Sequence, residues 1–197
     1  MARGVRARGA SSQGLRITDP DAPFDEKAAA RAFGLPADGR ALATLRARQK
    51  ADIGAFVDET MKGPKAAKGD IFYDRIDPDQ ARRIEPHLAT YLGRDHNLKH
   101  AVRVIDRDAV RHILKEHGAD RIPIKPDDIH HAPEVLRTGE LVSVHQNDGK
   151  EVMILRRKLV DKNWLYVGES IRGSGLERIR RPTLSVKSMY WTEGPSQ

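Results

Sequence analysis

Apolar residues near the start of the chain recur at the spacing of a helix face. Between residues 38 and 61 they recur at spacings near three and four and their multiples, a pattern typical of one face of an amphipathic helix: Leu42, Leu45, Ile53, Phe56 and Val57. Residues 25–33 predict another helix, because Asp25 can cap its start and Gly34 closes it. We therefore expect a helical extension and linker over residues 25–68, since Gly and Pro residues follow at 63–69.

Short apolar runs and helical patterns alternate between residues 70 and 136. The runs at 71–73 and 101–105 predict strands. The helical patterns begin at Asp-Pro or Asp signals, and they cover residues 77–91, where Pro86 predicts a kink or an early stop, 107–117, which Asp106 caps and Gly118 closes, and 124–136.

From residue 141 onward the pattern becomes that of strands joined by tight turns. Four strands are predicted, at 141–146, 151–159, 163–171 and 184–191. Asn147-Asp148-Gly149 and Asp161-Lys162-Asn163 have the composition of hairpin turns. Helices followed by an antiparallel meander indicate an α+β fold, with helices packed on an antiparallel sheet of about four strands over residues 69–193.

Composition narrows the class of protein. Hydrophobic residues make up 39% of the chain and charged residues 32%, and no cysteine is present, which excludes disulfides, thiolate metal sites and a cysteine nucleophile. Residues 1–24 are rich in Arg, Gly, Ala and Ser, and we expect a disordered basic arm there. No apolar run reaches the ~18 residues of a membrane span, and no secretion signal is recognisable.

The basic residues are unevenly distributed. The net charge is +7, and ten basic but only four acidic residues lie between positions 150 and 191. A clustered positive charge is typical of proteins that bind a polyanion, because neutralised phosphates release counterions. The alternative is that these basic residues form a solvated face whose charge serves only solubility.

Two histidines on the predicted helix 107–117 are the first candidates for chemistry. His112 and His117 lie five positions apart, so their side chains diverge by roughly 140° and do not form the i, i+4 pair that zinc prefers. We therefore expect no metal. Histidine suits acid–base catalysis because its pKa lies near neutrality, whereas His117 can also simply cap the helix end. His130 and His131 are expected at the surface.

Strand periodicity divides the remaining candidates between two sheet faces. Arg156 and Arg157 point to opposite faces, so at most one of them faces a site. Trp164 and Tyr166 share a face and either pack in the sheet or stack on a base.

On the last predicted strand, periodicity places Ser188 and Tyr190 on the face of Leu184 and Val186. Lys187 is expected to point the other way. If the Leu184 and Val186 face is core, a site can open only at its edge.

Several phrases between Asp70 and Trp191 resemble phage-associated nuclease domains grouped with barnase, EndoU, colicin-type ribonucleases and Rel-type toxins, the BECR fold. In chain order they are Ile76-Asp77-Pro78-Asp79-Gln80-Ala81, Gly93-Arg94-Asp95, Asp106 to Gly118 with its His112-Ile113-Leu114-Lys115-Glu116-His117-Gly118 core, Ile124-Lys125-Pro126-Asp127-Asp128-Ile129, Ala132-Pro133-Glu134-Val135 and Leu184-Ser185-Val186-Lys187-Ser188-Met189-Tyr190. The resemblance implies a curved antiparallel sheet.

The resemblance also implies a function: metal-independent cleavage of RNA by acid–base transesterification, without a cofactor. It assigns catalysis to His112 and His117 and substrate positioning to Ser188 and Tyr190. Phosphate binding falls to Arg156 or Arg157, Lys187 and Tyr166. The expected partners are RNA, or DNA, and a phage structural or immunity-type protein, with no membrane. The expected location is the bacterial cytoplasm or a phage virion.

Two other function classes stay open. One is a catalytically degenerate module of a phage head-associated protein that binds nucleic acid or a partner protein. The other is an RNA-binding regulator without catalysis. Both histidines in one open basic cleft would favour the enzyme, and histidines packed away from such a cleft would favour the module.

Overall fold

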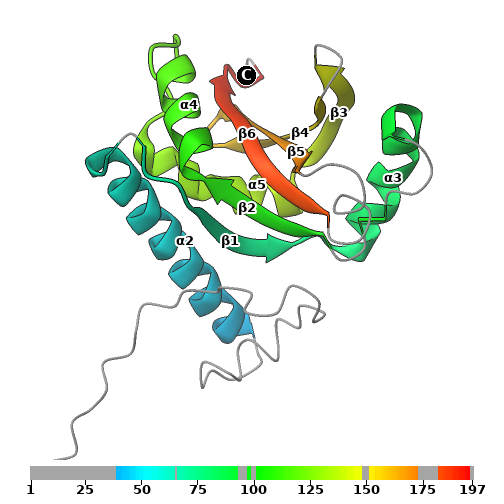
Figure 1. The fold of residues 1–197 in the computed structure, drawn as a ribbon, viewed down its shortest axis with the longest axis horizontal. Helices are drawn as coiled ribbons and strands as arrows, with labels where there is room; N and C mark the ends of the chain where they lie inside the picture. Colours follow the sequence, from blue (N-terminus) through cyan, green and yellow to red (C-terminus); the bar gives the residue numbers. More distant parts are fainter. Residues whose placement is uncertain are drawn as a thin grey trace, which may run out of the picture.

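A computed structural model describes residues 39–64, 66–92, 97–98, 101–147, 151–172 and 182–195. The predicted arm and the predicted helix at 25–33 lie outside these residues. In chain order the elements are α2 (Gly39–Lys62), β1 (Asp70–Arg75), α3 (Pro78–Leu92), β2 (Val102–Asp106), α4 (Arg107–His117), the 3₁₀ helix η1 (Pro126–His131), α5 (Ala132–Thr138), β3 (Glu140–Asn147), β4 (Glu151–Val160), β5 (Asn163–Arg172) and β6 (Thr183–Thr192) (Figure 1).

The strands form one mixed sheet in the order β1-β2-β6-β5-β4-β3. Neighbouring strands are antiparallel except β2 and β6, which run parallel from Val102 opposite Thr183 to Val104 opposite Ser185. The α+β class is confirmed. The predicted count of about four antiparallel strands is wrong, because the segments at 71–73 and 101–105 extend the sheet beyond β6. A sequence pattern does not reveal which distant strand a short apolar run will pair with.

Local signals explain most element boundaries. Asp106 caps α4, since its Oδ1 accepts a hydrogen bond from the Ala109 N–H at 2.6 Å. The β4–β5 hairpin turns at Asp161 and Lys162, whose φ angles of 46° and 75° match a type I′ turn. The turn predicted at 147–149 lies partly outside the described residues. Helix α3 continues through Pro86, so the early stop considered there does not occur.

One face of the sheet packs against helices and is called the covered face. Ile154, Leu165, Val167, Val186 and Met189 belong to it. The larger core cluster joins this face to α2, α4, η1 and α5, and the smaller cluster joins its other end to α3. Figure 1 shows α5 lying behind the sheet in this view.

The covered face also buries an ion pair. Both side chains of Arg103 and Glu169 are fully inaccessible, and the guanidinium donates to both carboxylate oxygens at 2.9 and 3.0 Å. Burial alone would lower the pKa of Arg103, but the Glu169 carboxylate reverses this and raises it. Arg103 therefore keeps its charge inside the core, where it is paired with Glu169.

Helix α2 belongs to the same core as the sheet. Ile53 and Val57 are 0% and 1% exposed within the larger cluster. The segment after the helix is held by α4, because the Arg111 guanidinium donates to the Pro64 and Ala67 carbonyls at 2.8 and 3.2 Å. Among the described residues, the larger core cluster therefore includes side chains from both sides of residue 68, and the domain boundary predicted there stays a prediction.

Candidate active site

The opposite side of β3–β6 is called the open face, because neither core cluster includes its described residues. Its members alternate with those of the covered face, and register places them side by side: Glu140, Leu155, Arg157, Trp164, Tyr166, Gly168, Ser188 and Tyr190. Around Arg157 and Tyr166 the open face presents polar and aromatic side chains, whereas Met153, Gly168 and Ser170 of the same face are buried.

One set of these residues forms a row across the strands. Glu140 of β3 pairs with Arg157 of β4, Arg157 with Tyr166 of β5, and Tyr166 with Tyr190 of β6. His117 at the end of α4 continues the row, with its ring centroid 5.4 Å from that of Tyr190. We call these five residues together with Asp120 the cross-strand row.

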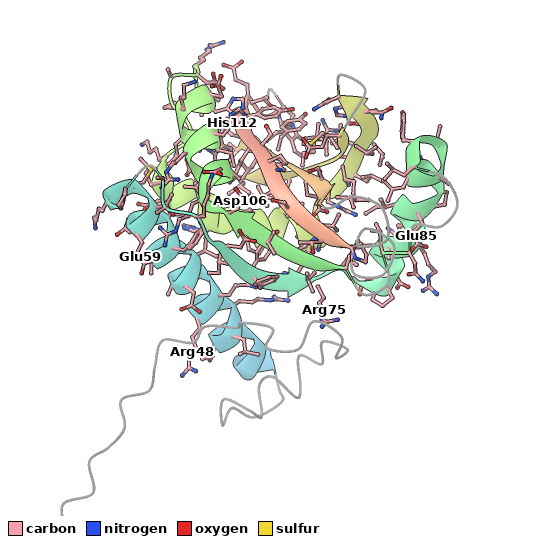
Figure 2. All side chains as sticks on the ribbon, viewed as in Figure 1. Arg48, Glu59, Arg75, Glu85, Asp106 and His112 are labelled. Atoms are coloured by element: carbon pink, nitrogen blue, oxygen red, sulfur yellow. The ribbon has the colours of Figure 1, made fainter. Side chains whose placement is uncertain are left out.

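Asp106 fixes α4 beside β6 and thereby places His117. One carboxylate oxygen caps the helix, and the other accepts a hydrogen bond from Ser185 of β6 at 3.0 Å. Figure 2 labels this carboxylate at the start of α4. The position of His117 against Tyr190 thus follows from a buried contact between the helix start and the neighbouring strand.

Arg157 is the cation at the centre of the row. Its guanidinium donates to Glu140 at 3.0 Å and to the Tyr166 hydroxyl at 3.1 Å, and its Cζ lies 4.4 Å from the Trp164 ring centroid. The hydrogen bonds to Tyr166 and Glu140 raise the pKa of this half-buried guanidinium. A planar, permanently charged group held in this way suits a phosphate.

The aromatic rings of the row cover one another. The Tyr166 and Tyr190 rings are stacked, with centroids 4.9 Å apart and planes 4° from parallel, and His117 lies next to Tyr190 at a tilt of 35°. Burial, and then the neighbouring Tyr166, raise the pKa of Tyr190, so its hydroxyl remains a donor at neutral pH. Because the ring faces are occupied, the row offers a ligand its polar edges.

His117 is oriented by Asp120. The Nδ1 atom lies 2.9 Å from Asp120 Oδ2, and the two side chains are 25% and 42% exposed. An ionised carboxylate only accepts hydrogen bonds, so Nδ1 donates and Nε2 is left to accept or release a proton. A carboxylate that fixes the tautomer of a partly exposed imidazole is an arrangement suited to acid–base chemistry.

A β-bulge changes the expected orientation of β6. Gly168 pairs with Ser188 but Glu169 pairs with Val186, so Lys187 is an extra residue in the ladder. The prediction that Ser188 and Tyr190 share a face with Leu184 and Val186 is therefore wrong, as they lie on the open face. Lys187 also lies there, with Nζ 3.7 Å from Glu151 Oε1.

The structure brings some of the predicted site residues together and places the others elsewhere. It brings His117, Tyr190, Tyr166 and Arg157 into one row, whereas Ser188 and Lys187 lie further along the open face. Arg156 lies on the covered face, is 5% exposed and donates to the Gly139 carbonyl at 3.1 Å. Desolvation lowers the pKa of Arg156.

His112 is exposed on α4 and projects on the β6 side of the helix in Figure 2. Its side chain forms no hydrogen bond or ring contact with the described residues. The two imidazoles of α4 therefore differ: one is packed and oriented, and the other is free in solvent.

His130 and His131 are half-buried rather than fully at the surface, with ring centroids 4.2 Å apart. Burial, followed by the charges of His131 and Lys50, lowers the pKa of His130 to about 4. They lie on η1, which packs on α2, and are not part of the row.

Sequence reasoning did not identify the two carboxylates at the ends of the row. Asp120 follows His117 by three residues, just beyond the end of α4. This short spacing could have identified Asp120 as a hydrogen-bond partner of His117. Glu140 had no such signal, because its pairing with Arg157 depends on a bulged β3–β4 register.

Across the described residues, no group of three or more His, Asp or Glu side chains is arranged to hold a metal ion. None of the described helices has the length and apolar character needed to cross a membrane. Comparison of the chain with protein-family models, curated proteins and solved structures finds no match.

Proposed function

We propose that the chain is a metal-independent endoribonuclease with a BECR-type domain, and that it cleaves RNA at the cross-strand row. The observation that carries this proposal is the Asp120–His117 pair beside Tyr190, in one row with Arg157. The row offers an oriented imidazole, a hydroxyl donor and a fixed guanidinium on an open sheet face. These groups supply the base and the fixed donors of phosphodiester transesterification, and the acid would come from outside the row.

The reaction requires two proton transfers. A base removes the proton of the 2′-hydroxyl, O2′ forms a bond to phosphorus, and the bond from phosphorus to O5′ breaks as an acid protonates O5′. The products are a 2′,3′-cyclic phosphate and a free 5′-hydroxyl. His117, whose Nδ1 donates to Asp120, has Nε2 available as the base. His112, on the same helix, is the proposed acid.

The charge that develops on the phosphorane needs fixed donors. Arg157 supplies a permanent cation, and the Tyr190 hydroxyl supplies a donor that stays protonated at neutral pH. Tyr166 receives a hydrogen bond from Arg157, which leaves its own hydroxyl proton for the substrate. Preorganised donors of this kind account for a large part of catalysis in many enzymes.

A binding module without catalysis is the second candidate. It is favoured by the position of His112, which is exposed and outside the row, so that only one imidazole is oriented there. In this case the polar and aromatic open face would bind nucleic acid or a partner in a phage head-associated protein. The phage or prophage origin rests on the phrase resemblance alone.

The deciding experiment is incubation of the full chain with labelled RNA and single-stranded DNA, with and without a chelator. We expect cleavage of RNA that survives chelation. His112→Ala or His117→Ala lowers the rate by at least ~100-fold and leaves binding nearly unchanged, since a general acid or base contributes about 10²–10⁴-fold. The pH–rate profile is bell-shaped, with limbs that belong to the pair.

His87→Ala is the matched control, because His87 is an exposed histidine on α3. It should leave the rate unchanged. A wild-type chain that cleaves no RNA, or a His117 variant that only melts earlier, supports the binding module. Cleavage abolished by chelation and restored by zinc or magnesium contradicts the metal-independent mechanism.

A further inference from the structure

A second polar cluster lies on the open face, away from the cross-strand row. Ser170 of β5 donates to Glu151 Oε1 of β4, and Lys187 Nζ of β6 lies 3.7 Å from the same oxygen. Alternation from Val186 places Lys187 on this face, and the β-bulge adds Ser188 on the same side. We call Glu151, Ser170 and Lys187 the bulge cluster.

The bulge cluster and the row are separated along β5. Ser170 follows Tyr166 by four residues, which corresponds to about 13 Å at the usual strand rise. Gly168 lies between them and has no side chain to stand above the sheet. A Cβ there would lie 2.7 Å from Met153 Cε and 3.5 Å from Ser188 Cβ. The Met153 side chain fills the space beside Gly168, and both Gly168 and Ser170 are buried. A ligand therefore reaches the bulge cluster at Lys187 and Glu151, whose side chains are 33% and 44% exposed.

Lys187 is available for an anion. Its side chain is 33% exposed, and 3.7 Å from Glu151 is too long for a hydrogen bond. Within the described part of the chain, the ammonium donates no hydrogen bond. The carboxylate oxygen nearest to it already accepts the Ser170 hydroxyl. A phosphate can therefore take the ammonium donors without breaking a hydrogen bond of the protein.

We propose that the bulge cluster is a second phosphate subsite for the same nucleic-acid strand that the row binds. This inference rests on the proposed function. Because stacked nucleotides rise ~3.4 Å each along a strand, a separation of about 13 Å corresponds to roughly four nucleotide steps, more than a dinucleotide can span. The substrate class is thus a single-stranded oligonucleotide, and a dinucleotide fills only the row.

The test compares two RNA substrates that share one cleavable step, a dinucleotide and a hexanucleotide. The wild-type chain cleaves the hexanucleotide with the higher kcat/KM. Lys187→Ala lowers this value by about tenfold, as expected for one charge-assisted contact, and leaves the dinucleotide unchanged. Lys62→Ala is the control, because Lys62 is an exposed lysine of α2 paired with Asp58 at 3.3 Å. An equal loss on both substrates, or no loss, overturns the subsite.

A binding measurement separates this inference from the proposed function. A hexanucleotide with 2′-O-methyl groups cannot be cleaved by transesterification, and its Kd reports the subsite even if the protein cleaves no RNA. Lys187→Ala should weaken its binding about tenfold, whereas Glu151→Gln should tighten it by removing the competing carboxylate. Tighter binding cannot result from misfolding. A Kd that neither variant changes overturns the subsite whether or not cleavage is observed.

Discussion

Two adjacent arginines on β4 show how different the two faces of the sheet are. Arg156 is buried on the covered face and donates to the Gly139 carbonyl. Arg157 lies on the open face and donates to Glu140 and Tyr166, with 31% of its side chain exposed. Neighbours in the sequence thus serve a folded core in one case and a solvent-accessible site in the other.

The ion pairs repeat the same contrast. The Arg103–Glu169 pair on the covered face has no exposed side-chain surface, whereas Glu140 of the open face is 58% exposed. A buried pair is costly to break, and an exposed pair contributes little to stability. Charges on the covered face are therefore important for stability, and charges on the open face contribute little to it.

The largest expected effect comes from removing the helix that completes the covered face. A chain that starts near Lys68 loses Ile53 and Val57 from the core. Loss of a buried aliphatic side chain costs ~2–5 kcal/mol, so the two losses approach the ~5–15 kcal/mol stability of a typical domain. We expect this chain to lose cooperative unfolding in urea, followed by circular dichroism. Cooperative unfolding at the full-length midpoint would instead support the boundary predicted at residue 68.

A smaller effect is expected when one partner of each ion pair is removed. Glu169→Ala leaves the Arg103 charge buried without its partner and should lower the free energy of unfolding by ~3–5 kcal/mol. Glu140→Ala should leave the urea midpoint nearly unchanged, because its partner is exposed to water. Equal urea midpoints for the Glu169 and Glu140 variants would contradict the expected difference in stability between the buried and the exposed ion pair.

The smallest expected effect is on the salt dependence of RNA binding, and it distinguishes Arg157 from Arg156. Arg157→Ala should reduce the slope of log K for RNA against log salt by ~0.7, the value for one phosphate contact to a single strand. Arg156→Ala should leave the slope unchanged and lower the free energy of unfolding by ~1–3 kcal/mol, because it removes a buried hydrogen-bond donor. A lower slope in the Arg156 variant would mean that Arg156 contacts a phosphate, which contradicts the assignment of this contact to Arg157 on the open face.

Periodicity and capping signals predicted much of this structure. The strands of the meander, the Asp106 cap and the opposite faces of Arg156 and Arg157 follow from spacing alone. The bulge at Lys187 does not, because one extra residue leaves the apolar pattern intact while it reverses every later side chain.

The candidate site was harder to predict than the fold. His117, Tyr166 and Tyr190 were singled out, but their contact depends on the register between β5 and β6 and on the packing of α4. Glu140 and Asp120 complete the row from a strand edge and from a loop, where no hydrophobic period marks the sequence. Long-range pairing is the information that a single sequence lacks.

The parallel contact between β2 and β6 has a consequence for how the protein is made. Val104 and Ser185 are paired across 81 positions of the chain, and closing a loop of that length costs about 4 kcal/mol of chain entropy. The β1–β2 pair reaches the rest of the sheet only through β6. Until β6 is in place the edge of β2 is unpaired, and an unpaired strand edge in an incompletely folded chain favours aggregation.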